Sequence, residues 1–186
     1  MAANQVLLFR VPTQVFYGQG VADQAGARAQ ELGAKRALVV TDKGVIGAGL
    51  LDGITGSLKN AGVEYGVFSA VDPNPTIANV EQCVAALREA GAEAIVGVGG
   101  GSPLDVAKAA SILATNGGQI SDYEGPEKVK QPTLPLIAIP TTAGTGSEVT
   151  IFTVITDPGR RAKFTIASVR SAARMALVDP LLTMSM

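Results

Sequence analysis

The chain has 186 residues, with 15 lysines and arginines against 16 aspartates and glutamates, so its formal net charge is −1. Aromatic residues make up only 4% of it. The even charge balance, without a basic stripe, argues against nucleic-acid binding. No apolar run approaches the ~18 residues that a membrane span needs. We therefore expect one domain with a substantial core and no membrane partner.

The N-terminus lacks a charged segment followed by a long apolar one, so we expect no signal peptide and a cytoplasmic protein. The single cysteine, Cys83, has no partner for an intrachain disulfide. It falls in a helical pattern, where a small buried hydrophobic side chain is expected.

The first half of the chain alternates short apolar runs with helix-favouring stretches. Ile77, Val80 and Val84, for example, recur at helical spacing. The expected elements in chain order are a hairpin or paired strands over 7–10 and 14–17, a helix over 21–32, a strand over 37–41, a helix over 50–60, a strand over 65–68 and a helix over 77–90.

The second half continues this alternation and adds a hairpin around Asp157-Pro158-Gly159. The expected elements are a strand over 94–98, a helix over 103–114, a polar loop with a short helix over 119–131, a strand over 136–139, hairpin strands over 149–156 and 163–167, and a strand over 175–178. Alternating strands and helices predict an α/β fold, with a Rossmann-like parallel sheet flanked by helices and a β-hairpin.

A glycine-rich turn joins the strand over 94–98 to the next helix. Gly99, Gly100 and Gly101 let the backbone turn tightly and approach a ligand. Ser102 is expected to cap the helix, with Pro103 at its first position. Free N–H groups at such a helix start form an anion site, and we expect a cofactor pyrophosphate there. The spacing matches neither G-x-G-x-x-G nor the Walker A loop, so a plain βα turn is the alternative.

Two charged residues follow in the same helix. Asp105 completes a Ser-x-x-Asp capping box and is expected to reach back to the Ser102 N–H. A carboxylate beside a pyrophosphate is unfavourable, so we assign Asp105 a structural role, with Lys108 as a partner on the helix face. Glu148 is assigned no role as an acid or a base.

A second loop, Pro-Thr-Thr-Ala-Gly-Thr-Gly-Ser-Glu over 140–148, follows another apolar strand. Thr141, Thr142, Thr145 and Ser147 offer hydroxyl groups that suit phosphate oxygens or a carboxamide. The alternative is a turn that satisfies its own hydrogen bonds.

Three polar residues outside these loops are further candidates. Asp42 follows a buried strand, where its carboxylate can accept hydrogen bonds from a ribose and repel a 2′-phosphate, which favours NAD over NADP. A turn-forming aspartate is the alternative. From the residues alone, Asn74 is a turn residue between two prolines and Lys163 is a surface lysine.

The two loops, Gly-Gly-Gly-Ser-Pro-Leu-Asp-Val-Ala-Lys over 99–108 and the stretch over 140–148, together resemble the group III, iron-containing alcohol dehydrogenases. Matching pieces over 39–42, 72–76 and 178–180 extend the resemblance through nearly the whole chain. It implies the dehydroquinate synthase-like N-terminal domain of that family, with NAD as the cofactor. It also implies that Asp42 contacts the adenosine ribose and that Asn74, Lys163 and Leu182 lie near the cofactor.

The resemblance further implies hydride transfer between NAD and a primary alcohol or diol, or the matching aldehyde. A metal, Fe(II) or Zn, acts there as a Lewis acid held by one aspartate and several histidines of a helical C-terminal domain. This chain has no histidine and ends shortly after Asp179-Pro180-Leu181-Leu182-Thr183. We therefore expect residues 1–186 to form a single cofactor-binding domain without catalytic or metal-binding residues and inactive by itself.

A missing partner domain would expose apolar surface, so we also expect a homo-oligomer. Two alternatives stay open. One is a polyol-phosphate dehydrogenase or a dehydroquinate synthase-like enzyme of the same architecture. The other is a non-catalytic module that binds a nucleotide or assembles with itself.

Overall fold

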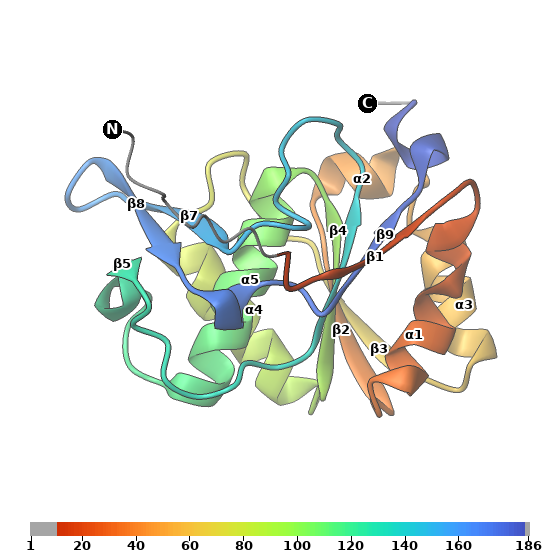
Figure 1. The fold of residues 1–186 in the computed structure, drawn as a ribbon, viewed down its shortest axis with the longest axis horizontal. Helices are drawn as coiled ribbons and strands as arrows, with labels where there is room; N and C mark the ends of the chain where they lie inside the picture. Colours follow the sequence, from red (N-terminus) through yellow and green to blue (C-terminus); the bar gives the residue numbers. More distant parts are fainter. Residues whose placement is uncertain (1–10, 185–186) are drawn as a thin grey trace, which may run out of the picture.

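The computed structural model describes residues 11–184 of the chain. At its centre lies a six-stranded sheet in the order β1-β9-β6-β4-β2-β3, in which every neighbouring pair is parallel. Figure 1 shows the sheet between two groups of helices. The strands of this sheet are β1 (Gln14–Tyr17), β2 (Arg36–Val40), β3 (Glu64–Phe68), β4 (Ala94–Gly99), β6 (Leu136–Pro140) and β9 (Met175–Val178).

Helices cover both faces of the sheet, so its strands are apolar on both sides. Alternate residues of β2 show this: Leu38 and Val40 belong to the core under α4 and α5, whereas Val39 belongs to the core under α1 and α3. The helices are α1 (Ala25–Glu31), α2 (Lys43–Gly47), α3 (Asp52–Asn60), α4 (Ile77–Glu89) and α5 (Gly101–Asn116), with short 3₁₀ turns η1 (Val21–Gln24), η2 (Ile120–Tyr123), η3 (Val169–Ser171) and η4 (Pro180–Thr183).

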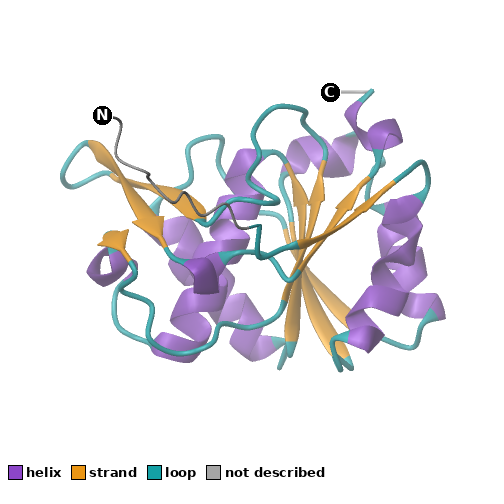
Figure 2. Ribbon diagram, in the orientation of Figure 1, coloured by secondary structure: helices purple, strands orange, loops and turns teal. Residues whose placement is uncertain are grey.

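A small second sheet packs on the outer side of α5 (Figure 2). Its strands β7 (Phe152–Asp157) and β8 (Ala162–Ala167) form the predicted antiparallel hairpin, and β5 (Gly125–Pro126) pairs with β8. The Asp157 carboxylate accepts the N–H of Gly159 at 2.9 Å, which stabilises the turn. Ile155, Phe164 and Ile166 are buried and join this sheet to the core under α4 and α5.

The α/β architecture is therefore confirmed, with some local differences. The stretch over 21–32 is a 3₁₀ turn followed by the seven-residue helix α1. Strand β1 pairs with β9, and the predicted strand over 7–10 lies outside the described residues. Helix α2 was not predicted. Between residues 11 and 184, no helix combines the length and the apolar character needed to cross a membrane.

The order of the strands creates a crevice at one end of the sheet. Strand β3 lies on one side of β2 and β4 on the other, and the helices that follow β2 and β4 cover opposite faces. In open α/β sheets, ligands bind at such a reversal, outside the carboxyl ends of the strands. The fold thus predicts a ligand site among the residues that follow β2, β3 and β4.

Candidate functional site

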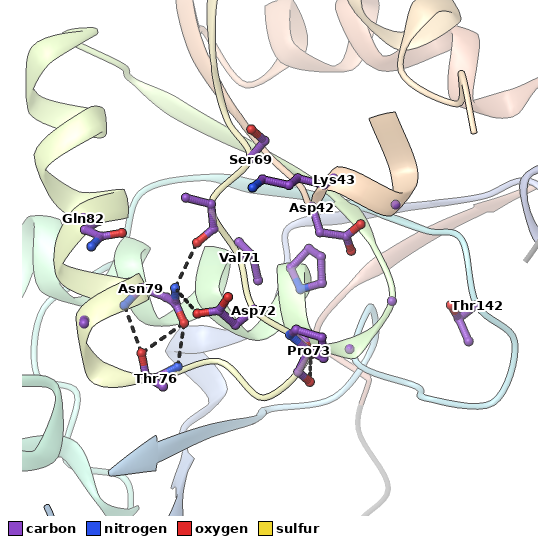
Figure 3. Close-up of a pocket in the computed structure, with 17 residues that line it drawn as sticks. Asp42, Lys43, Ser69, Val71, Asp72, Pro73, Thr76, Asn79, Gln82 and Thr142 are labelled. Atoms are coloured by element: carbon purple, nitrogen blue, oxygen red, sulfur yellow. Dashed lines mark hydrogen bonds between the residues drawn. The ribbon is translucent and has the colours of Figure 1, made fainter. Parts of the chain in front are cut away.

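A cleft of about 760 Å³ lies beyond the carboxyl ends of β2, β3 and β4. The structure brings Asp42, Gly100, Gly101, Ser102 and Thr142 together in its lining. These residues come from three separate stretches of the chain, and Figure 3 shows Asp42 and Thr142 among the side chains drawn around the cleft.

One wall of the cleft is the start of α5. The helix begins at Gly101, and Gly100, which has no side chain to cap it, occupies the N-cap position. The first N–H groups of a helix have no partner within it, so this end presents donors and a positive dipole to the cleft. The predicted Ser102 cap is wrong, because Ser102 lies inside the first turn and its hydroxyl donates to the Pro73 carbonyl at 2.7 Å.

The glycines of this loop permit close packing of neighbouring groups. Gly99 has φ +144°, and a Cβ placed there would lie 2.6 Å from Cγ of Pro103. A Cβ on Gly100 would lie 3.0 Å from Oγ1 of Thr142. Any larger residue at Gly100 would therefore press on the loop over 140–148, the threonine-rich loop, and take space in front of the first turn of α5.

Asp42 both caps a helix and lines the cleft. It caps α2, since its Oδ1 accepts the N–H of Val45 at 2.9 Å, and its half-buried side chain also lines the cleft. The capping explains why the chain turns into a helix directly after β2. Its neighbour Lys43 lines the cleft as well, so both charges are present at this wall.

The opposite wall contains residues that the sequence did not single out. Buried Asn79 donates from Nδ2 to Oδ2 of Asp72 at 3.0 Å and to the Ala70 carbonyl at 2.9 Å (Figure 3). Asn79 and Thr76 also form the capping box of α4. Ser69 also lines this wall. Ser69 could have been predicted as a site residue from its position directly after β3, because the carboxyl ends of parallel strands meet at the same edge of the sheet.

The remaining predicted residues do not line the cleft. Nζ of Lys163 donates to Oδ1 of Asn74 at 2.8 Å, so hairpin strand β8 reaches back to the proline loop. Thr145 is exposed, whereas Thr141 is fully buried. Leu182 packs from η4 against the core under α1 and α3.

Ser147 belongs to a buried polar cluster beside α5. Its hydroxyl donates to Oδ1 of Asp105 at 2.7 Å and accepts from Nζ of Lys108 at 3.1 Å. Nζ of Lys108 also donates to the carbonyls of Thr150 at 3.1 Å and Phe152 at 2.9 Å. The predicted bond from Asp105 back to Ser102 is therefore wrong, because this carboxylate accepts hydrogen bonds from Ser147, at the end of the threonine-rich loop, and from Val154 in β7.

Burial shifts both charges of this cluster. It lowers the pKa of Lys108 to about 8, although the carboxylates of Asp105 and Glu148 oppose the shift. Burial likewise raises the pKa of Asp105, against the hydrogen bond from Ser147 and the charge of Lys108. The pair is thus held inside the protein at a cost in desolvation that its hydrogen bonds and mutual attraction offset only in part.

The lowered pKa of Lys108 predicts a pH-dependent stability. Between about pH 8 and its ordinary value of 10.5, the unfolded chain keeps a proton that the folded chain has released, so stability rises with pH. Relative to a Lys108→Met variant, the free energy of unfolding should rise by about 2 kcal/mol from pH 8 to pH 10. Urea unfolding at both pH values measures this, and a constant difference would contradict it.

A metal site of the kind the resemblance implies does not fit these residues. The chain has no histidine. Over residues 11–184, no three His, Cys, Asp or Glu side chains gather closely enough to hold a metal ion. The cleft and its open helix end, by contrast, suit an anionic nucleotide.

A parallel sheet wound in both directions, with a cleft at its reversal, defines a doubly wound α/β protein of Rossmann-like architecture. The similarity of the chain to known proteins identifies its family. Residues 12–180 match the family model "Iron-containing alcohol dehydrogenase", and the chain belongs to this family.

Several characterised proteins are similar to the chain. It is 38% identical to the NAD-dependent methanol dehydrogenase of Bacillus methanolicus, over 92% of this chain and 45% of that protein. It is 42% identical to the 1,3-propanediol dehydrogenase of Klebsiella pneumoniae, over 94% and 46% of the two chains. The chain thus spans about half the length of these relatives.

Solved structures agree with this likeness. A crystal structure of 1,3-propanediol oxidoreductase matches with a TM-score of 0.95 and 40% identity, over 98% of this chain and 48% of that one. The sulfoacetaldehyde reductase of Bifidobacterium kashiwanohense, solved in complex with NAD⁺, matches with a TM-score of 0.89 and 34% identity, over 97% and 48%. Both likenesses confirm the α/β fold and the partial coverage.

Proposed function

We propose that the chain binds NAD in the cleft and forms the cofactor-binding part of an alcohol dehydrogenase. One observation carries the proposal. The N-terminal end of α5, which no side chain caps, and the carboxylate of Asp42 line the same cleft, at the reversal of the sheet. The first group suits a pyrophosphate and the second a ribose. The relative solved with NAD⁺ supports this assignment.

We assign the residues around the cleft to parts of the cofactor. The N–H groups of Gly101 and Ser102 face the pyrophosphate, and the hydroxyl of Thr142 lies beside it. Asp42 accepts hydrogen bonds from the adenosine ribose. Asn74 and Lys163, bound to each other, stand beside the cofactor at the hairpin side. When bound, NAD supplies the acceptor for a hydride.

We propose an alcohol or aldehyde as the substrate, because the relatives include dehydrogenases named for methanol, 1,3-propanediol and choline. Because residues 11–184 do not fit a metal, we place the Fe or Zn of the family, and the groups that bind the alcohol, outside these residues. The chain alone is then expected to bind NAD without oxidising alcohols. Val15 and Tyr17 are exposed on β1, which is an edge strand of the sheet within residues 11–184, and they support the further proposal that the chain self-associates.

Replacing Asp42 tests the proposed ribose contact. Asparagine caps a helix about as well as aspartate, so Asp42→Asn keeps the cap on α2 and removes only the charge. We expect the ratio of NADP affinity to NAD affinity to rise about tenfold, equivalent to about 1.4 kcal/mol. Calorimetric titration of both variants with each nucleotide measures the ratio.

An exposed carboxylate provides the control. Asp52 begins α3 and does not line the cleft, so Asp52→Asn should leave the ratio unchanged. If the unsubstituted chain binds NAD and Asp42→Asn keeps its NADP-to-NAD ratio, Asp42 does not contact the ribose.

A further inference from the structure

The buried cluster of Asp105, Ser147 and Lys108 joins parts of the chain that are far apart in sequence. The Ser147 hydroxyl and the Asp105 carboxylate that it contacts are 42 residues apart. The other carboxylate oxygen of Asp105 accepts the N–H of Val154 at 3.2 Å. One helix therefore binds both the end of the threonine-rich loop and the start of the hairpin.

The only proton of the Ser147 hydroxyl is used within this cluster. The hydroxyl donates this proton to Asp105 and accepts a bond from the ammonium group of Lys108. The side chain is only 6% exposed, so it offers no free donor to a ligand. Donation of a hydrogen bond from the Ser147 hydroxyl to a cofactor, which the sequence suggested, would require breaking its charge-assisted bond to Asp105.

The cluster is connected to the cleft in two ways, through helix α5 and through the threonine-rich loop. Asp105 stands one helical turn beyond Gly101, which lines the cleft at the start of α5. Ser147 ends the loop that begins at Thr141, and the Thr141 N–H donates to the Gly99 carbonyl at 3.0 Å. The loop is thus fastened at both ends to β4 and α5, whose junction forms one wall of the cleft.

Between these fixed ends, the loop contains two glycines, which restrict the backbone less than other residues do. Gly144 and Gly146 adopt φ values of +101° and +65°, in the region that glycine enters without strain. Thr142, which lines the cleft, is exposed. Its position therefore depends on how the loop ends are held.

We propose that Asp105, Ser147 and Lys108 are positioning residues, which hold the loop over 141–148 against the start of α5. Through this they fix the position of Thr142 beside Gly100 at the edge of the cleft. The inference rests on the proposed function, because the consequence for affinity requires that the cleft binds NAD. A loop held in its bound position loses less entropy when the ligand arrives.

The experiment compares two buried serines of similar environment. Ser147→Ala removes the hydroxyl from the cluster. Ser111→Ala is the matched control, because Ser111 is 1% exposed and donates within α5 to the Lys108 carbonyl at 2.7 Å, away from the loop. Two measurements are made on each variant: hydrogen exchange of the unliganded chain, and calorimetric titration with NAD.

For Ser147→Ala, we expect the amides over 146–150 to exchange about tenfold faster and the Kd for NAD to rise about tenfold, as the loss of one charge-assisted bond predicts. For Ser111→Ala, both values should stay near those of the unsubstituted chain. Thermal unfolding of the two variants separates a general loss of stability from a local one.

The outcomes distinguish this inference from the proposed function. Unchanged loop exchange in Ser147→Ala, unchanged NAD affinity in a variant whose loop exchanges faster, or equal changes in both variants would overturn it. If the unsubstituted chain fails to bind NAD, the proposed function falls, and with it the role in affinity. The exchange data still decide whether the cluster holds the loop.

Discussion

Lys108→Ala is expected to lower the free energy of unfolding at pH 7 by about 4 kcal/mol. The side chain is fully buried, and its ammonium group binds Ser147, Thr150 and Phe152. Its removal leaves the Asp105 carboxylate buried without a countercharge and leaves a cavity. Denaturant unfolding monitored by circular dichroism measures the change.

Two further variants make this result specific. Lys59 lies in the last turn of α3 and is exposed, so Lys59→Ala should change stability by less than about 0.5 kcal/mol. The double variant Asp105→Asn with Lys108→Met should lose less stability than the two single changes added together, because neither charge is then left unpaired. Additive losses would contradict a direct coupling of Asp105 and Lys108.

Gly100→Val is expected to weaken NAD binding at least about a hundredfold, or about 2.7 kcal/mol, with little change in folding. The backbone of Gly100 has φ −76°, which valine can adopt. Its side chain, however, would lie against Thr142 and fill the space in front of the first N–H groups of α5. Calorimetric titration with NAD measures the loss.

The matched control is a glycine with open space around it. A Cβ on Gly56 in α3 would meet no atom within 4 Å, so Gly56→Ala should keep the full affinity and leave stability equal or slightly higher. Tight NAD binding by Gly100→Val would show that the cofactor does not pass over this loop.

Strands and helices were predictable because local patterns determine them. The runs 94–98 and 136–139 are apolar at every position, which is typical of a parallel strand covered by helices on both faces. Both are strands of the central sheet. Turn residues placed the hairpin around Asp157-Pro158-Gly159. Helix α2 was missed because it has only five residues and two of them are glycine.

The wall of the cleft formed by Asp42 and the glycine loop was also predictable, since strand ends of a parallel sheet meet at one edge. The partners of Asp105 and Ser147 were not, because they lie far apart in the sequence and no local spacing joins them. The capping box at Ser102 failed for the same reason: a local pattern allowed it, and distant donors at Ser147 and Val154 took the carboxylate.

An NMR titration of the isotope-labelled chain with NAD tests the central claim most directly. If the cofactor lies along the start of α5, the amide shifts should saturate and be largest at Gly100, Gly101, Thr142 and Lys43. Saturating shifts centred elsewhere, for example at Arg170 and Arg174 around the separate hollow beside η3, would contradict the assignment of the cleft. The absence of any shift at high NAD concentration would contradict NAD binding by this chain.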